Sequence, residues 1–232
     1  MNVPDRGLAN TDVAKSSFAW LFLTIFVPFG LGHFVSYLYR TVNAVIYGDL
    51  SRDLGLPPES LGLLTAVYFL TFALAQLPLG VLLDRYGPRS VQSPMLLIAS
   101  GGALIFASAD TTTGLLIGRG MIGLGVAGSL MSAIKACSIW LPTERLPLST
   151  ACLLSVGGFG AMASTAPMHT VMEILTWREA FWVLALMTLL VSAFIHFSVK
   201  KEFTPKTTRL SDMCAEVGRL YQSSLFWRLA LY

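Results

Sequence analysis

Apolar residues gather in long runs along this chain, and short polar stretches separate them. Six runs are long enough to cross a bilayer, since a spanning helix needs about 20 apolar residues. They cover Phe18–Tyr47, Leu61–Leu83, Val91–Ala109, Gly114–Trp140, Leu148–Leu175 and Trp177–Val199. A further apolar run begins at Leu225 and reaches Tyr232. The pattern predicts an all-α membrane protein, built as a six-helix transmembrane bundle with the start of a seventh helix.

The polar stretches divide the chain into four parts. A tail over residues 1–16 precedes the bundle at 17–199, a linker follows over 200–224, and residues 225–232 begin the seventh helix. Six linker residues share one helical face: Leu210, Met213, Cys214, Val217, Leu220 and Tyr221. We expect either an amphipathic helix on the inner membrane surface or a solvated linker here.

Composition supports a membrane protein and excludes several other classes. Hydrophobic residues make up 54% of the 232 and charged residues only 12%, whereas soluble domains carry about 25% charged residues. The net charge of +3 is small, and no basic run is interleaved with aromatics, so nucleic acid is not an expected partner. The three cysteines are isolated, without a CxxC or a nearby histidine. We expect no metal site and no cofactor.

Loop charges orient the bundle, because Lys and Arg favour the cytoplasmic side. With the N-terminus inside, ten cations lie on the inner side: Arg6, Lys15, Arg85, Arg89, Arg145, Lys200, Lys201, Lys206, Arg209 and Arg219. Only Arg52 and Arg178 then lie in the outer loops. The sequence therefore predicts that both ends of the chain are cytoplasmic.

A polar stripe interrupts the first apolar run. Its members recur at helical spacing: His33, Ser36, Tyr37, Arg40, Asn43 and Tyr47. Such a stripe should face a water-filled cavity or the bundle interior, because charges are costly in lipid. A guanidinium among hydrogen-bonding groups suits a carboxylate or phosphate, which it holds with two parallel bonds. The alternatives are that Arg40 snorkels to lipid headgroups and that His33 is a satisfied packing residue.

The fourth and fifth runs carry further features. Arg119 and Lys135 are 16 residues apart, about 160° around a straight helix, so they face nearly opposite ways. One can line the cavity while the other serves a neighbouring helix or the inner gate, although Lys135 is also close enough to the interface to snorkel. Small residues from Gly157 to Ser164 favour tight helix crossing. They form either a structural contact or a sliding surface.

Residues 80–89, with the sequence GVLLDRYGPR, follow the second run on the predicted cytoplasmic side. They resemble the signature loop between helices 2 and 3 of the major facilitator superfamily, Gly-x-x-x-Asp-Arg-x-Gly followed by basic residues. The resemblance implies a gate whose charge-assisted bonds form in one conformation and break in the other, with Gly80, Asp84, Arg85, Gly87 and Arg89 as its residues. Pro88 stands where the family often has a basic residue. The alternative is a solvated turn that only sets topology.

Three further stretches match the family in order. Residues 118–125, with Arg119 between two glycines, resemble the fourth-helix motif implicated in proton coupling, although Ile122 replaces its usual Gln. Residues 140–145 resemble the turn between helices 4 and 5, and residues 177–182 resemble the start of helix 6. The resemblance covers about residues 17–232 and implies a coupling role for Arg119.

Within the family, Tyr37-Leu38-Tyr39-Arg40 followed by Asn43 is similar to the first helix of organic-anion transporters, which include anion:cation symporters and organophosphate:phosphate antiporters. There the arginine contacts the anionic substrate. Lys135, before Trp140-Leu141-Pro142, also follows the symporter pattern, whereas the Gly-Pro pair of the antiporters is not clearly present. The resemblance therefore implies that Tyr37, Arg40, Asn43 and Lys135 bind a small organic anion, and it favours proton-coupled symport.

Family members usually have twelve helices, as two six-helix halves around a midplane cavity, and this chain matches one half. It is either a fragment, which is the simpler explanation, or a natural half-protein that pairs with a second chain. The expected partners are the lipid bilayer, a small anionic organic substrate, protons and the missing C-terminal six-helix half. The expected location is a bacterial inner membrane.

Three functional hypotheses follow. The first is secondary active transport by alternating access, and the second is a non-transporting half-transporter that serves as a membrane partner or scaffold subunit. An intramembrane enzyme is the least favoured, because the sequence holds no paired carboxylates, no HExxH and no Ser/His pair in plausible register. No catalytic residue is therefore assigned.

Overall fold

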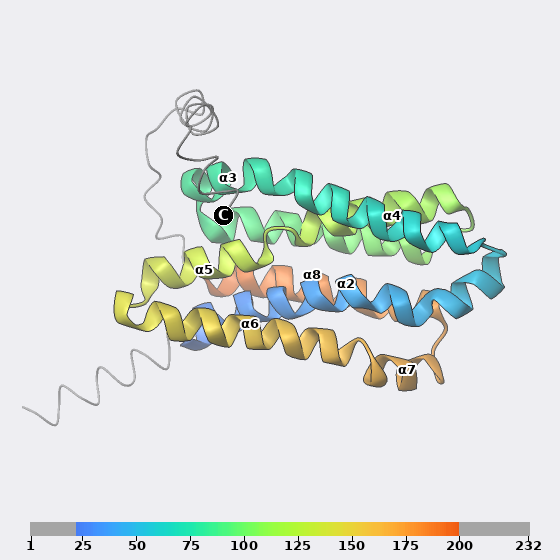
Figure 1. Cartoon of the computed structure of the whole chain (residues 1–232). Helices are drawn as coiled ribbons and strands as arrows, with labels where there is room; N and C mark the ends of the chain where they lie inside the picture. Colours follow the sequence, from blue (N-terminus) through green and yellow to red (C-terminus); the bar gives the residue numbers. More distant parts are fainter. Residues whose placement is uncertain (1–21, 200–232) are drawn as a thin grey trace, which may run out of the picture.

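The computed structural model describes residues 22–199 as an all-helical bundle (Figure 1). The predicted tail at 1–16, the linker at 200–224 and the seventh helix at 225–232 lie outside the described residues. In chain order the elements are η1 Phe22–Phe26, α2 Val27–Leu54, α3 Pro58–Ala107, α4 Thr112–Val126, α5 Ser129–Trp140, η2 Thr143–Arg145, α6 Leu146–Ala163, α7 Ala166–Met172 and α8 Trp177–Ser198.

These elements form the six predicted passes. Helix α3 contributes two of them, because its path turns at Gly87, whose φ of 78° and ψ of 163° lie outside the helical region. A positive φ is easily adopted by glycine alone, which explains why the signature loop turns there. Helices α4 and α5 together make the fourth pass, and α6 and α7 together make the fifth. The predicted six-helix bundle is therefore confirmed.

Five helical segments in the described range are long and apolar enough to cross a membrane: Glu59–Gln76, Pro78–Ala107, Thr112–Trp140, Thr143–Met172 and Trp177–Ser198. Helix α2 is not among them, because its polar stripe and the charged residues of its last turns lower its hydropathy. It is nevertheless central, since it contacts α6, α8 and α5 (Figure 1). A polar helix enclosed by apolar ones is the arrangement expected for a cavity wall.

Glycines allow α4 and α6 to approach their neighbours closely. A Cβ atom at Gly123 of α4 would lie 2.3 Å from the Tyr68 carbonyl oxygen of α3. One at Gly160 of α6 would lie 2.5 Å from the Phe34 carbonyl oxygen of α2. Neither crossing has room for a side chain, so small residues determine both. The helix contact predicted for the fifth-run glycines is present.

One arginine joins three helix ends at the predicted outer end of the bundle. Arg178, in the first turn of α8, donates to the Asp53 carboxylate at the end of α2 and to Asp110 Oδ1, 2.9 Å away, before α4. Trp177 Nε1 also donates to Asp53, at 3.1 Å. Arg178 was predicted on the outer side, but this cluster was not, because Asp53 and Asp110 are far from Arg178 in the sequence.

Candidate functional site

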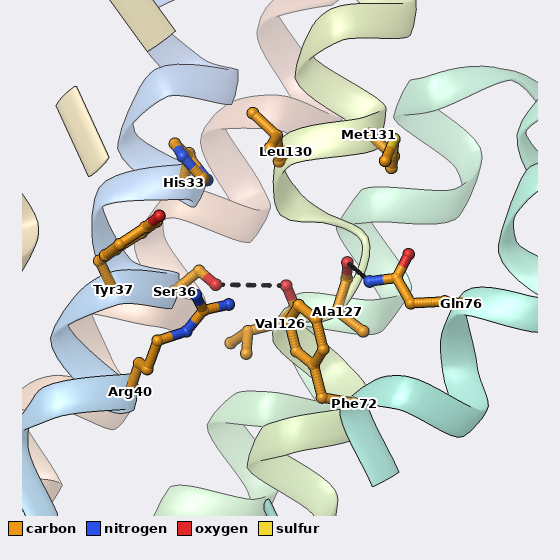
Figure 2. Close-up of a pocket in the computed structure, with 10 residues that line it drawn as sticks. All are labelled: His33, Ser36, Tyr37, Arg40, Phe72, Gln76, Val126, Ala127, Leu130 and Met131. Atoms are coloured by element: carbon orange, nitrogen blue, oxygen red, sulfur yellow. Dashed lines mark hydrogen bonds between the residues drawn. The ribbon is translucent and has the colours of Figure 1, made fainter. Parts of the chain in front are cut away.

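A cavity of about 290 Å³ lies between α2, α3 and the junction of α4 with α5. Figure 2 shows the side chains that surround it, which come from three different passes. The cavity is lined by His33, Ser36, Tyr37, Arg40, Phe72, Gln76, Val126, Ala127, Leu130 and Met131. Four of these belong to the polar stripe predicted on the first pass, so the stripe does face a cavity.

Arg40 is the one residue in that lining whose side chain carries a permanent charge. Three aromatic rings surround its guanidinium, whose carbon lies 4.8 Å from the Tyr37 centroid, 5.1 Å from that of Phe72 and 5.8 Å from that of Phe69. Its Nε is buried and has no hydrogen-bond partner. None of the ion pairs in the described residues involves Arg40. The side chain is thus held in place by rings while its charge lacks a carboxylate.

The rings also determine how Arg40 can bind. Aromatic faces attract the flat faces of a guanidinium by cation–π interaction, which leaves the N–H groups at its edge for a ligand. Two parallel N–H donors match the two oxygens of a carboxylate or phosphate. The chemistry of this group therefore suits an anion with two oxygen atoms that can lie in the guanidinium plane.

The junction between α4 and α5 forms another wall of the cavity. The helix is interrupted at Ala127 and Gly128, so the preceding carbonyl groups lack their usual helical donors. Ser36 Oγ of α2 donates to the Val126 carbonyl oxygen at 3.4 Å, and Gln76 Nε2 of α3 donates to that of Ala127 at 3.0 Å (Figure 2). Side chains of two other passes thus stabilise the interruption.

Arg119 lies elsewhere and is only 1% exposed. Its Nη1 donates to the Tyr39 carbonyl oxygen at 3.0 Å, and its Nη2 donates to Asn43 Oδ1. Its guanidinium carbon lies 4.9 Å from the Phe106 ring centroid and 5.5 Å from that of Phe181. Arg119 therefore joins α4 to α2 and does not belong to the cavity lining.

The other two predicted substrate ligands also lie outside the cavity lining. Asn43 is 5% exposed; it accepts from Arg119, and its Nδ2 donates to Thr65 Oγ1 at 3.2 Å. Lys135 Nζ donates to Asp84 Oδ1 at 2.6 Å, as an ion pair with the signature loop. The structure thus brings Tyr37 and Arg40 together, and it places Asn43 and Lys135 with other partners.

The signature loop contacts both α5 and the end of α8. Besides the Asp84–Lys135 pair, Arg89 Nη1 donates to the Val199 carbonyl oxygen at 2.8 Å. The Arg85 guanidinium lies 5.4 Å from the Tyr86 ring centroid, while Gly80 is exposed with open space around it. The loop therefore ties the second and third passes to the fourth and sixth.

Two features of the site were not predicted from the sequence. Phe72 and Gln76 line the cavity from the second pass, and Gln76 could have been noticed because it is a polar residue inside an apolar run. The interruption at Ala127 and Gly128 could not be predicted, because no proline lies near it in the sequence. Among residues 22–199, no group of three His, Cys, Asp or Glu residues could hold a metal ion.

Comparison with known proteins identifies relatives for most of the chain. The family model described as Major Facilitator Superfamily matches residues 29–231. Similar proteins include the probable sulfoacetate transporter SauU of Cupriavidus necator, which is 24% identical over 68% of this chain and 37% of its own length. The niacin transporter NiaP of Acinetobacter baylyi is 30% identical over 66% of this chain and 35% of its own.

A third relative is the probable L-galactonate transporter of Escherichia coli, 25% identical over 63% of this chain and 32% of its own length. The matched region thus spans about a third of each of these three relatives.

Proposed function

Since this chain belongs to the Major Facilitator Superfamily, a family of membrane transporters and not of enzymes, we propose that it moves a small organic anion across the membrane by alternating access. Arg40 is the residue that binds the anionic group. The observation that carries this proposal is a guanidinium inside a cavity, encircled by aromatic rings and without a carboxylate partner. An unpaired cation inside a membrane is costly, and a bound anion would remove that cost.

The relatives support the same chemical class of substrate. The names of three of them refer to sulfoacetate, niacin and L-galactonate, which are organic acids. Tyr37, on the same helical turn as Arg40, is placed to orient the substrate. In this proposal Asn43 acts indirectly, through Arg119 and the helix that carries Arg40.

Gating and coupling complete the proposal. The Asp84–Lys135 pair and the Arg89 bond to Val199 close the inner end in one conformation and break in the other. Lys135 then acts at this gate, and its contact with the substrate belongs to a different conformation. Transport is driven by proton symport, and Arg119 assists coupling by holding α4 against α2. A second six-helix half, in the same chain or in another, supplies the opposite wall of the cavity.

The membrane that we propose is the bacterial inner membrane, with the N-terminus in the cytoplasm. This orientation follows from the ten inner and two outer cations of the loops and of the two tails. Labelling of single cysteines introduced beside Arg85 and beside Arg52 tests it. A membrane-impermeant reagent added to intact cells should label the second site and spare the first, and the reverse pattern would overturn the orientation.

The experiment for the transport proposal is uptake by the complete protein in proteoliposomes. Niacin, sulfoacetate and L-galactonate serve as anionic probes, and nicotinamide is the neutral match for niacin. We expect uptake of at least one acid, none of nicotinamide, and a loss of uptake when a protonophore collapses an imposed proton gradient. Arg40→Ala should abolish uptake, whereas Arg52→Ala, at the exposed end of α2, should not. Unchanged uptake by Arg40→Ala would contradict the assignment.

A further inference from the structure

His33 is a buried side chain with unsatisfied polar atoms. It is 3% exposed, and neither Nδ1 nor Nε2 has a hydrogen-bond partner. A buried donor or acceptor without a partner costs about 1–3 kcal/mol, and most buried polar side chains avoid that cost. An imidazole with both nitrogens unpaired by protein groups therefore requires an explanation, and a role in binding a ligand is one.

The position of His33 fits this explanation. It lines the same cavity as Arg40 and lies seven residues before it, about two helical turns away on the same face. Side chains on a helix lean towards its N-terminus, so the Arg40 side chain extends towards His33, as Figure 2 shows. The Tyr37 ring lies between them and meets the His33 ring edge to face, with centroids 5.1 Å apart.

The neighbouring helix leaves room for His33. A Cβ atom at Gly157 of α6 would lie 2.6 Å from His33 Nε2 and 2.8 Å from the Tyr37 ring. No other residue type fits at Gly157 without moving these two rings. The absence of a side chain there thus maintains the positions of two residues of the cavity lining.

Of the other polar side chains of the cavity, two are engaged with the backbone of the α4–α5 junction, and Tyr37 adds a hydroxyl group. Ser36 and Gln76 donate to the Val126 and Ala127 carbonyl oxygens at the α4–α5 junction. The rest of the lining is apolar or aromatic, with Phe72 among its members. A ligand here therefore meets one cation at one end, one imidazole at the other and a mostly apolar and aromatic surface, which includes Tyr37, between them.

We infer that His33 is a specificity-determining residue of this cavity, and that the substrate is a carboxylate with an apolar or aromatic body and one hydrogen-bonding group at its far end. The inference rests on the proposed function, since Arg40 holds the carboxylate. The imidazole has a donor at one nitrogen and, when neutral, an acceptor at the other, so a hydroxyl group or a ring nitrogen satisfies it. A polyhydroxylated acid fits poorly, because its additional hydroxyl groups would lose water against an apolar wall.

The test is equilibrium binding to the purified protein in lipid nanodiscs, with three probes of equal charge. Benzoate has the carboxylate and the ring, 4-hydroxybenzoate adds the distal hydroxyl group, and gluconate has the carboxylate on a polyhydroxylated body. We expect 4-hydroxybenzoate to bind roughly tenfold more tightly than benzoate, as one buried hydrogen bond allows, and gluconate to bind most weakly.

Variants of His33 assign the difference to this residue. His33→Leu should reduce the affinity for 4-hydroxybenzoate to that for benzoate and leave benzoate binding unchanged, while His33→Gln should retain part of the advantage. His196→Leu, at the exposed end of α8, is the matched control. Circular dichroism checks that each variant is folded. If His33→Leu does not fold, the comparison with His33→Gln still tests the inference.

Each outcome is decisive. Equal binding of benzoate and 4-hydroxybenzoate, or an advantage that persists in His33→Leu, overturns the inference and leaves Arg40-dependent anion binding intact. Binding that is indifferent to Arg40→Ala indicates instead that the proposed function is wrong.

Discussion

Two arginines lie within the helical bundle, on different passes and in different surroundings. Arg119 is 1% exposed and donates to two oxygen acceptors on α2. Arg40 lines a cavity, and its buried Nε has no hydrogen-bond partner. Both guanidiniums lie beside aromatic rings, so the aromatic surroundings do not distinguish them. The hydrogen-bond acceptors do distinguish them. Arg119 has two on α2 and joins helices, whereas Arg40 has none among residues 22–199 and keeps its N–H groups for a ligand.

The difference also shows how intramembrane charge is stabilised. Arg119 is compensated within the bundle by oxygen atoms of α2, so its contribution to the fold requires no ligand. Arg40 lies among aromatic rings and has no carboxylate partner, and rings stabilise a cation less than a carboxylate does. In the proposed function a bound anion completes this compensation, so the contribution of Arg40 should depend on the ligand.

The largest expected effect follows substitution of Arg119. Arg119→Ala leaves the Tyr39 carbonyl group and Asn43 without their donor and opens a hole beside Phe106. We expect a loss of about 3 kcal/mol or more in the free energy of unfolding, measured by denaturation in detergent. Arg119→Lys should lose less, since an ammonium group can still donate to one of the acceptors. A fully stable Arg119→Ala with weakened ligand binding would reverse the roles of the two arginines.

Arg40→Leu should affect ligand binding rather than stability, the reverse of what we expect for Arg119→Ala. We expect a small change in intrinsic stability and a complete loss of ligand-induced stabilisation. Saturating niacin or another bound acid, at about 100 times its dissociation constant, should raise the unfolding free energy of the unmodified protein by about 2.7 kcal/mol. The same acid should not shift Arg40→Leu. A large drop in the stability of Arg40→Leu without ligand would indicate that Arg40 is structural as well.

Substitution of Asn43 tests whether this side chain acts with Arg40 at the substrate or with Arg119 in the fold. The sequence predicts that Asn43 contacts the substrate together with Arg40, whereas the structure places it against Arg119 and Thr65. Asn43→Ala should therefore cost about 1–2 kcal/mol of stability and leave the dissociation constant of the acid within about twofold. A tenfold weaker affinity with unchanged stability would restore Asn43 as a direct ligand.

Lys135 should have a smaller effect on stability. Its side chain and that of Asp84 are 32% and 42% exposed, and exposed ion pairs contribute about 1 kcal/mol or less. We expect Lys135→Met to change the unfolding free energy by that amount and to leave equilibrium binding of the acid unchanged. Uptake should fall together with that of Asp84→Asn, since both remove the same bond of the gate. Weakened binding in Lys135→Met alone would support direct substrate contact.

The smallest expected effect is on the pH dependence of stability, through the cluster of Asp53, Asp110 and Arg178 at the outer end of the bundle. Asp53 lies beyond the predicted end of the first span, and the hydrogen bonds from Arg178 and then from Trp177 hold its pKa below the usual value. A carboxylate with a lowered pKa in the folded state contributes stability above its unfolded pKa, and that contribution disappears as the pH falls through its folded pKa. Acid should therefore destabilise the protein slightly, and Asp53→Asn should lack this component. An identical acid dependence in Asp53→Asn would exclude the cluster as its source.

Much of the fold could be predicted from hydrophobicity and charge. All six passes lie where the apolar runs place them, because length and hydropathy are local properties of the sequence. The first pass extends to Leu54, beyond the predicted Tyr47, because the helix ends at Gly55, whose φ of 62° is left-handed. Gly48, which directly follows the predicted end of the run, stays helical. Which of two glycines ends a helix depends on the contacts of the turn, and periodicity does not reveal these.

The site was predicted only in part. Tyr37 and Arg40 could be assigned to the cavity because a polar stripe must avoid lipid. Asn43 lies three residues after Arg40, about 60° around the helix, and that rotation turns it towards α4. The α4–α5 interruption depends on Ser36 and Gln76 from other passes, so no local signal marks it. Contacts between passes, rather than within them, are what the sequence alone did not reveal.

The most direct test of the two roles is nuclear magnetic resonance of the Nε–H groups of arginine in the nanodisc-embedded protein. Both Arg40 and Arg119 have a buried Nε without a hydrogen-bond partner, so their signals start from comparable conditions. Arg40→Lys and Arg119→Lys assign the two signals by removing one each. Titration with niacin or another bound acid should shift the Arg40 signal and leave that of Arg119 in place. A shift of the Arg119 signal, with that of Arg40 unmoved, would contradict the assignment of Arg40 as the anion-binding residue.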